Sequence, residues 1–171
     1  MQNTTKTILA ISPGTRELGV AVVTNNKLLL YAVKNITNRK SKAVILEKVT
    51  KIFAQLILDY EVSVVAIKQM EVVQPNGDLV VDVTKHIKAL AKKLKLTLYH
   101  CRSKEVYGII CNKNKPTSQE VARYLAVQYF ELAKHINQTK RESWKTNYYG
   151  RLFFAIALGL VCSRKLQKQV N

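Results

Sequence analysis

The sequence predicts an α/β fold in which a mixed β-sheet is flanked by helices. Three observations predict it. Three apolar runs near the start are separated only by turns, later segments carry apolar residues at helical spacing, and strand-length apolar runs follow two of these helices. Runs joined by turns form an antiparallel meander, whereas a strand that returns after a helix pairs in parallel. The 171 residues, 47% of them apolar, fit one domain over residues 1–171.

The first three strands are expected at 7–11, 18–23 and 28–33, where apolar residues dominate. Asn25 and Asn26 lie between the second and third of these runs. Asparagine tolerates positive φ better than most residues do. The pair therefore predicts a tight hairpin turn.

Two amphipathic helices follow, and each leads into a strand. The first helix is expected over 41–59, and the apolar run 62–67 after it reads as a strand. The second helix, over 80–94, follows the turn Pro75-Asn76-Gly77 and precedes a short strand at 97–101. The apolar stripe of the first helix is Val44, Ile45, Val49, Ile52, Phe53, Leu56 and Ile57, and that of the second is Val80, Val83, Ile87, Leu90 and Leu94.

The next segment is predicted to hold two helices around a basic loop. Ser103 can cap a brief helix at 104–107. The loop, at 112–116, contains two lysines and ends in a proline. Behind it, a helix is expected from 119 to about 136.

The sequence leaves the start of that helix open, because either Thr117 or Ser118 can cap it. A polar stretch at 137–147 then separates it from the last helix, expected at about 148–168. That helix contains the apolar block LFFAIALGLVC. The order of elements supports a sheet with helices on its faces.

The charge of the chain is strongly unbalanced. Lysine and arginine number 28 against 11 acidic residues, which gives a formal net charge of +17. Such a surface attracts polyanions, and nucleic acid is the expected one because basic side chains release condensed counterions from a phosphate backbone. General solubility or an acidic protein partner would be the less specific explanation.

Targeting and cofactor signals are weak. The first residues, 1–6, do not precede a long apolar run, and the longest apolar stretch, 152–162, is about half of a membrane span. We therefore expect a cytoplasmic protein without membrane contact. The histidines and cysteines lack metal-ligand spacing, so no zinc site or disulfide framework is expected; the cysteines are Cys101, Cys111 and Cys162.

Four stretches occur in an order and at a spacing that match one family. They are ILAISPGTRELGVAVV (8–23), VVAIKQMEV (64–72), SKEVYGIICNKNKPTSQEVARYL (103–125) and YYGRLFFAIALGL (148–160). Together they resemble the motifs of RuvC-type Holliday-junction resolvases, within the ribonuclease H-like superfamily. The resemblance spans nearly the whole chain and implies a ribonuclease H-like mixed sheet flanked by helices.

The resemblance also implies where a catalytic site would lie. In that family, converging carboxylates hold two metal ions, usually magnesium, which activate a water and stabilise the leaving oxygen. None of the matching positions here is acidic. They are Ser12, Lys68, Tyr149 and Leu152. If the alignment of the last motif shifts by one residue, Gly150 and Phe153 replace Tyr149 and Leu152.

We therefore predict a catalytically degenerate RuvC-like protein that binds nucleic acid, DNA foremost, without cleaving it and without a metal cofactor. Lys68, with Arg151, is expected to pair with a phosphate in the cleft. Alternatively, Lys68 simply reaches solvent or pairs with Glu71. The expected backbone contacts are Arg16, Lys68, Lys113, Lys115, Lys140, Arg141, Lys145 and Arg151.

Aromatic residues could add base contacts to this backbone binding. The family's junction resolvases place an aromatic wedge where this chain has Glu71, so junction recognition by that wedge is not expected. Trp144, Tyr148 and Tyr149 lie beside basic residues and could stack on bases. Anchoring of the last helix to the core is the simpler role for them.

Two other classes of function remain open. The chain could be a divergent structure-specific endonuclease, dependent on Mg²⁺ or Mn²⁺, with relocated carboxylates. It could also be an interaction module, because RuvC-type proteins are dimers and the 80–94 stripe could form a homodimer face. Core packing explains that stripe equally well. The acids for a relocated site would be Glu17, Glu71, Asp78 and Asp82.

Overall fold

The computed structural model describes residues 5–37, 41–70, 78–136 and 143–170, with the side chains of the last helix described over 149–169. Its centre is a five-stranded sheet of order β3-β2-β1-β4-β5. β1 pairs antiparallel with β2, and β2 with β3, whereas β1–β4 and β4–β5 are parallel. The predicted mixed sheet is confirmed. Its strands are β1 (Thr7–Pro13), β2 (Glu17–Thr24), β3 (Lys27–Asn35), β4 (Val64–Lys68) and β5 (Thr97–Cys101).

The turn between β2 and β3 is the predicted asparagine hairpin. Thr24 pairs with Lys27, which leaves two residues in the loop. Asn25 and Asn26 adopt φ of 48° and 61°. Positive φ at both central residues matches the right-handed twist of the flanking strands, which explains why asparagine occupies both positions.

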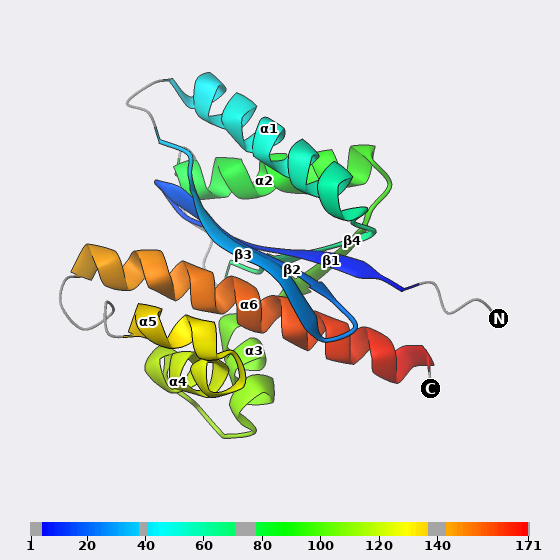
Figure 1. Ribbon diagram of the computed structural model, residues 1–171. Helices are drawn as coiled ribbons and strands as arrows, with labels where there is room; N and C mark the ends of the chain where they lie inside the picture. The colour runs from blue at the N-terminus through cyan, green and yellow to red at the C-terminus, as the bar shows by residue number, and fades with distance from the viewer. Residues whose placement is uncertain (1–4, 38–40, 71–77, 137–142, 171) are drawn as a thin grey trace.

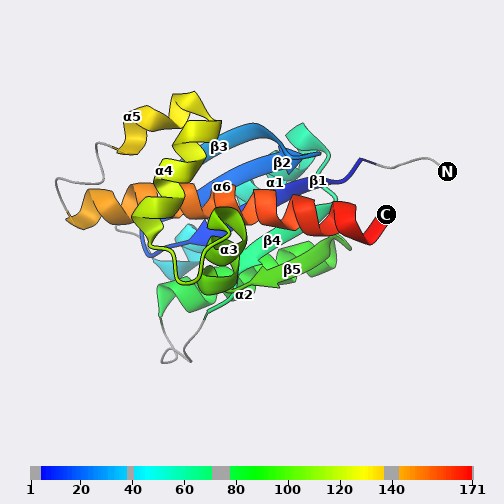
Figure 2. The same cartoon turned by 90° about the horizontal axis from the view of Figure 1, so that it is seen from below.

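Helices form a layer on each face of the sheet (Figure 1). On one face lie α1 (Lys42–Tyr60) and α2 (Leu79–Lys93). The long helix α6 (Ser143–Val170) lies along the other face, and a smaller group of helices packs beyond it (Figure 2). That group comprises α3 (Ser103–Cys111), α4 (Ser118–Gln128), the 3₁₀ turn η1 (Phe130–Leu132) and α5 (Ala133–Ile136).

The predicted helical stripes belong to the core under α1 and α2. In α1, Ile45, Val49 and Phe53 are buried, as expected, although Val44 is 37% exposed. In α2, Val83 and Ile87 are fully buried against the sheet and α1. Core packing therefore explains the centre of the 80–94 stripe, whereas Leu94 at its end is 50% exposed. A homodimer face on this helix stays a prediction.

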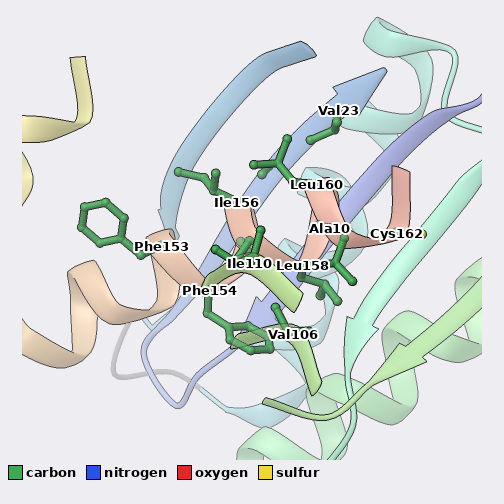
Figure 3. Packing of buried hydrophobic residues seen from close by; sticks show 14 of the residues in the cluster. Ala10, Val23, Val106, Ile110, Phe153, Phe154, Ile156, Leu158, Leu160 and Cys162 are labelled. Atoms are coloured by element: carbon green, nitrogen blue, oxygen red, sulfur yellow. The ribbon is translucent and has the colours of Figure 1, made fainter. Parts of the chain in front are cut away.

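α6 packs unusually close to the sheet. A Cβ atom at Gly159 would lie 2.8 Å from Cγ2 of Val23 and 3.3 Å from Cβ of Ala10. The small residues at the crossing let the helix backbone approach β1 and β2, and large apolar side chains fill the space on either side (Figure 3). This contact fixes the height of α6 above the strands.

The smaller helices differ in detail from the sequence prediction. Ser103 is the first residue of α3, and Arg102 takes the N-cap position, so Ser103 does not cap. Thr117 is the N-cap of α4: its hydroxyl accepts from the Glu120 N–H at 3.2 Å, and the Glu120 carboxylate accepts from the Thr117 N–H at 2.7 Å. This reciprocal capping box explains why the helix starts at Ser118.

The single helix predicted over 119–136 is wrong. α4 ends at Gln128, because Tyr129 adopts φ −125° and ψ 89°, and η1 and α5 follow. The predicted start of the last helix at about 148 is also too late, since α6 begins at Ser143, within the polar stretch 137–147. The predicted turn at 75–77 lies outside the described residues.

Two further expectations can be compared with the structure. Cys101, Cys111 and Cys162 are free, and burial is the main cause that raises the pKa of the Cys162 thiol to about 12. Within the described ranges, no helix has the length and apolar character needed to span a bilayer.

Candidate nucleic-acid interface at the carboxyl ends of β1 and β4

β1 and β4 are parallel neighbours, so their carboxyl ends meet at one edge of the sheet. Ile11 pairs with Ile67, which places Ser12 and Lys68 next to each other at this edge. Because side chains alternate along a strand, Ser12 and Lys68 face the same side as Ala10 and Ala66, toward α6. We call this region, with the part of α6 above it, the β1–β4 cleft.

Lys68 lies over an aromatic ring of α6. Its Nζ is 5.1 Å from the ring centroid of Phe154, a buried residue that also meets Tyr107 edge-on with centroids 5.8 Å apart. A cation above a ring face is stabilised by the ring quadrupole. The lysine is thus held over the cleft while it remains partly exposed to solvent.

Arg151 reaches from α6 to the turn after β1. Its Nε donates to Oε1 of Glu17 at 2.7 Å, and its Nη1 donates to the Pro13 carbonyl at 3.2 Å. The two charged side chains are 25% and 15% exposed. Gly14 makes room for the guanidinium, since a Cβ there would lie 2.2 Å from Nε. The charged group is therefore fixed in place before any ligand arrives.

A second glycine brings the helix backbone down to the strand. Gly19 of β2 pairs with Ser12, and a Cβ on Gly19 would lie 2.3 Å from the backbone carbonyl oxygen of Arg151. This close approach brings Arg151 next to Glu17 and the Pro13 carbonyl. Gly14 and Gly19 together leave the space that Arg151 occupies.

The donor set does not fit a pair of metal ions. Ser12 and Lys68 supply no carboxylate, and Glu17 is occupied by Arg151. Asp78 caps α2, and Asp82 lies 3.1 Å from Lys42 Nζ. Among the residues that the structure describes, no group of three or more His, Cys, Asp or Glu side chains could hold a metal ion. Glu71, the remaining candidate for a relocated site and for pairing with Lys68, lies outside those residues.

The two other family positions belong to the core. Leu152 is 3% exposed. Tyr149 stacks on His135 with ring centroids 5.1 Å apart, and His135 meets Tyr31 of β3 edge-on. Tyr149 therefore anchors α6 to α5, which favours the simpler role expected for it. The side chains of Trp144 and Tyr148 lie outside the described residues.

The other predicted contacts fall into three groups. Arg16 is exposed in the turn after β1, so it shares the edge with Lys68 and Arg151. Lys113 and Lys115 are exposed in the separate loop between α3 and α4. For the remaining three the structure gives no side-chain position: Lys140 and Arg141 fall outside the described residues, and Lys145 lies in the first turns of α6.

Lys113 has a partner within the chain. Its Nζ donates to Oε1 of Glu120 at 2.6 Å. The ammonium of Lys113, followed by the Thr117 backbone N–H, lowers the pKa of the Glu120 carboxyl to about 2. Part of the lysine charge is thus neutralised locally, which reduces its expected contribution to phosphate binding.

We predict that Glu120 titrates near pH 2 in the folded protein and that Lys113→Ala moves this pKa up toward the ordinary glutamate value of 4.5. Because the folded-state pKa is lowered, the stabilising contribution is present above the unfolded-state pKa and is lost as the pH falls toward 2. NMR titration of the side-chain carboxyl measures the shift. An unchanged pKa in the variant would contradict the ion pair.

Sequence reasoning missed two functional neighbours in the cleft. Glu17, predicted above as a ligand of a relocated metal site, pairs with Arg151. Phe154 was not singled out, although it lies three residues after Arg151, on the same side of a helix. That spacing is the signal that could have placed both over the same strand ends.

The sheet order, the long helix across one face and the helices on the other define a ribonuclease H-like fold of the RuvC type. The chain is similar to RuvC of T. thermophilus in complex with a Holliday junction substrate, with a TM-score of 0.71 and 16% identity over 97% of this chain and 96% of that one.

It is similar also to another Thermus thermophilus RuvC structure, with a TM-score of 0.70, 15% identity and 96% of each chain covered. The yeast mitochondrial Holliday junction resolvase Ydc2 gives a TM-score of 0.67 and 14% identity over 95% of this chain and 81% of that one. At these identities the likeness concerns the fold. No family model and no curated protein matches the sequence.

Proposed function

We propose that this chain binds nucleic acid, DNA foremost, through the phosphate backbone and does not cleave it. The observation that carries the proposal is Lys68 in the β1–β4 cleft, whose Nζ lies over the ring of Phe154 at the end of β4. An ammonium at this position suits a phosphate oxyanion, whereas Glu17 neutralises part of the Arg151 charge and reduces the expected contribution of that residue. The net charge of +17 would draw the polyanion to the surface.

The chemistry of the same residues supports the proposal that the chain does not cleave DNA. Hydrolysis of a phosphodiester by two metal ions needs several carboxylate oxygens that converge on the ions. The strand ends here carry a hydroxyl and an amine, and the nearby Glu17 carboxylate already neutralises Arg151. We therefore expect binding that requires no metal cofactor.

The competing proposal is a divergent endonuclease with relocated carboxylates. Three of its four acids have other partners: Glu17 pairs with Arg151, Asp78 caps a helix, and Asp82 lies beside Lys42. This proposal predicts that branched DNA is nicked in the presence of Mg²⁺ or Mn²⁺.

Lys68→Ala should weaken binding to a fluorescein-labelled four-way DNA junction about tenfold, because loss of one charge-assisted contact costs ~1.5 kcal/mol of binding free energy. It should also reduce the slope of log affinity against log salt by about 1. Fluorescence anisotropy at about 50 and about 200 mM salt measures both quantities.

Lys93→Ala is the matched control because it removes the same charge at the other end of the sheet. Lys93 ends α2 just before β5 begins, and β5 runs parallel to β4, so Lys93 lies at the amino ends of these strands. Equal losses in both variants would contradict a specific role for the cleft. Magnesium-dependent nicking of the junction by the wild-type protein would overturn the proposal of binding without cleavage.

A further inference from the structure

An exposed aromatic residue lies at the break between α4 and α5. Phe130 is 87% exposed and Val127, three residues earlier, is 86% exposed. Tyr124, one turn before Val127, is 37% exposed, and its hydroxyl accepts from Nε2 of Gln128 at 3.0 Å. We call Tyr124, Val127 and Phe130 the α4 tip. Water contact with so much apolar surface is costly unless a ligand covers it.

The backbone break produces this exposure. Tyr129 leaves helical geometry, and its ring turns inward: its hydroxyl donates to the Asn26 carbonyl at 3.3 Å, and the ring packs on the core. Leu132 is fully buried. Since Tyr129 and Leu132 point into the protein, the 3₁₀ turn between them leaves Phe130 facing solvent.

Charged residues flank the tip. Arg123 lies one turn before Val127, and Lys134 lies one turn after Phe130; both are exposed. Glu131 is the exposed acid nearby, whereas Glu120 pairs with Lys113. One cation on each side of an exposed ring suits a ligand with a planar aromatic group between two anionic groups.

We propose that the α4 tip stacks on an unpaired nucleobase, with Arg123 and Lys134 next to the flanking phosphates. Every base offers a π-face, so one phenyl ring can bind unpaired bases without sequence preference. A second copy of this chain fits the tip less well, because two molecules that each carry +17 repel one another whereas a polyanion is attracted.

This inference adds preference for unpaired bases to the proposed backbone binding, and it rests on that function for the class of ligand. It concerns different residues from those of the β1–β4 cleft. The two proposals can therefore fail separately.

The test compares binding of a fluorescein-labelled oligothymidylate of about 20 nucleotides with binding of a duplex of the same length. Phe130→Ala should weaken binding of the single strand about tenfold, change duplex binding less than twofold, and leave the salt slope unchanged. Phe130→Trp should retain single-strand affinity, whereas Phe130→Leu should lose it, because an apolar residue without a π-face cannot stack. Arg123→Ala should lower the salt slope by about 1.

Leu58→Ala is the control, since Leu58 is 77% exposed on α1, on the other face of the sheet. Equal single-strand affinity of Phe130→Ala and wild type would overturn the stacking proposal, and unaltered duplex binding would leave the backbone proposal standing. Failure of the wild type to bind either probe would overturn both. If light scattering shows a dimer that Phe130→Ala dissociates, the tip is a protein interface and the proposal is wrong.

Discussion

Gly19→Ala is expected to lower the free energy of unfolding by about 1–3 kcal/mol, the range for overpacking a core. The new methyl group would lie 2.3 Å from the backbone carbonyl oxygen of Arg151. That oxygen cannot move aside easily, because α6 is also held close to the sheet at Gly159. Thermal unfolding should show a drop of roughly 2–4 °C per kcal/mol.

Gly150→Ala provides the control within α6. Nothing lies within 4 Å of a Cβ at Gly150, and the residue is in the helix interior. Alanine should therefore stabilise the protein by about 0.5–1 kcal/mol through the lower entropy of the unfolded chain. If Gly19→Ala left the melting temperature unchanged or raised it, as expected for Gly150→Ala, the close approach at Gly19 would be contradicted.

Removal of either partner in the Arg151–Glu17 pair is expected to destabilise the fold by about 1–2 kcal/mol. The suitable variants are Arg151→Met, which keeps the apolar stem, and Glu17→Gln, which keeps the shape. Each single change leaves the other charge partly buried, so the double variant should cost less than the sum. The coupling energy should be about 1–2 kcal/mol in a double-mutant cycle by urea denaturation.

The pair Glu47–Lys51 on α1 is the matched control. Its atoms are 2.9 Å apart, but its side chains are 64% and 74% exposed. Solvent screens such an exposed pair, so its coupling should be clearly smaller than that of Arg151 and Glu17. Additive effects in the Arg151–Glu17 cycle, or equal coupling in both pairs, would show that the guanidinium is not specifically held at the turn.

The sheet could be predicted from sequence because its signals are local. Strand-length apolar runs, the Asn25-Asn26 turn and the two stripes before parallel strands each constrain a few neighbouring residues. The resemblance to RuvC-type resolvases indicated the same fold, and the sheet order agrees with it. Ser12 and Lys68, the positions that match the first two family motifs, lie at neighbouring strand ends.

Features that depend on distant residues were missed or left open. At the break, the Tyr129 hydroxyl donates to the carbonyl of Asn26 in the β2–β3 hairpin, 103 positions away. No sequence pattern within 119–136 predicts a contact with Asn26. The partner of Arg151, Glu17, likewise lies 134 positions away, at the start of β2, where Gly14 and Gly19 leave room for the arginine.

Fold class, excess positive charge and the residue types at the strand ends can be read from the amino-acid sequence. The contacts of the side chains cannot: Lys68 lies over Phe154, Arg151 pairs with Glu17, and Phe130, in the turn after α4, is exposed to solvent. The difference lies in the sequence distance over which each kind of signal acts. Apolar periodicity and turn chemistry act between residues a few positions apart, whereas the direction of a charged or aromatic side chain depends on the packing of helices and strands that are far apart in the chain.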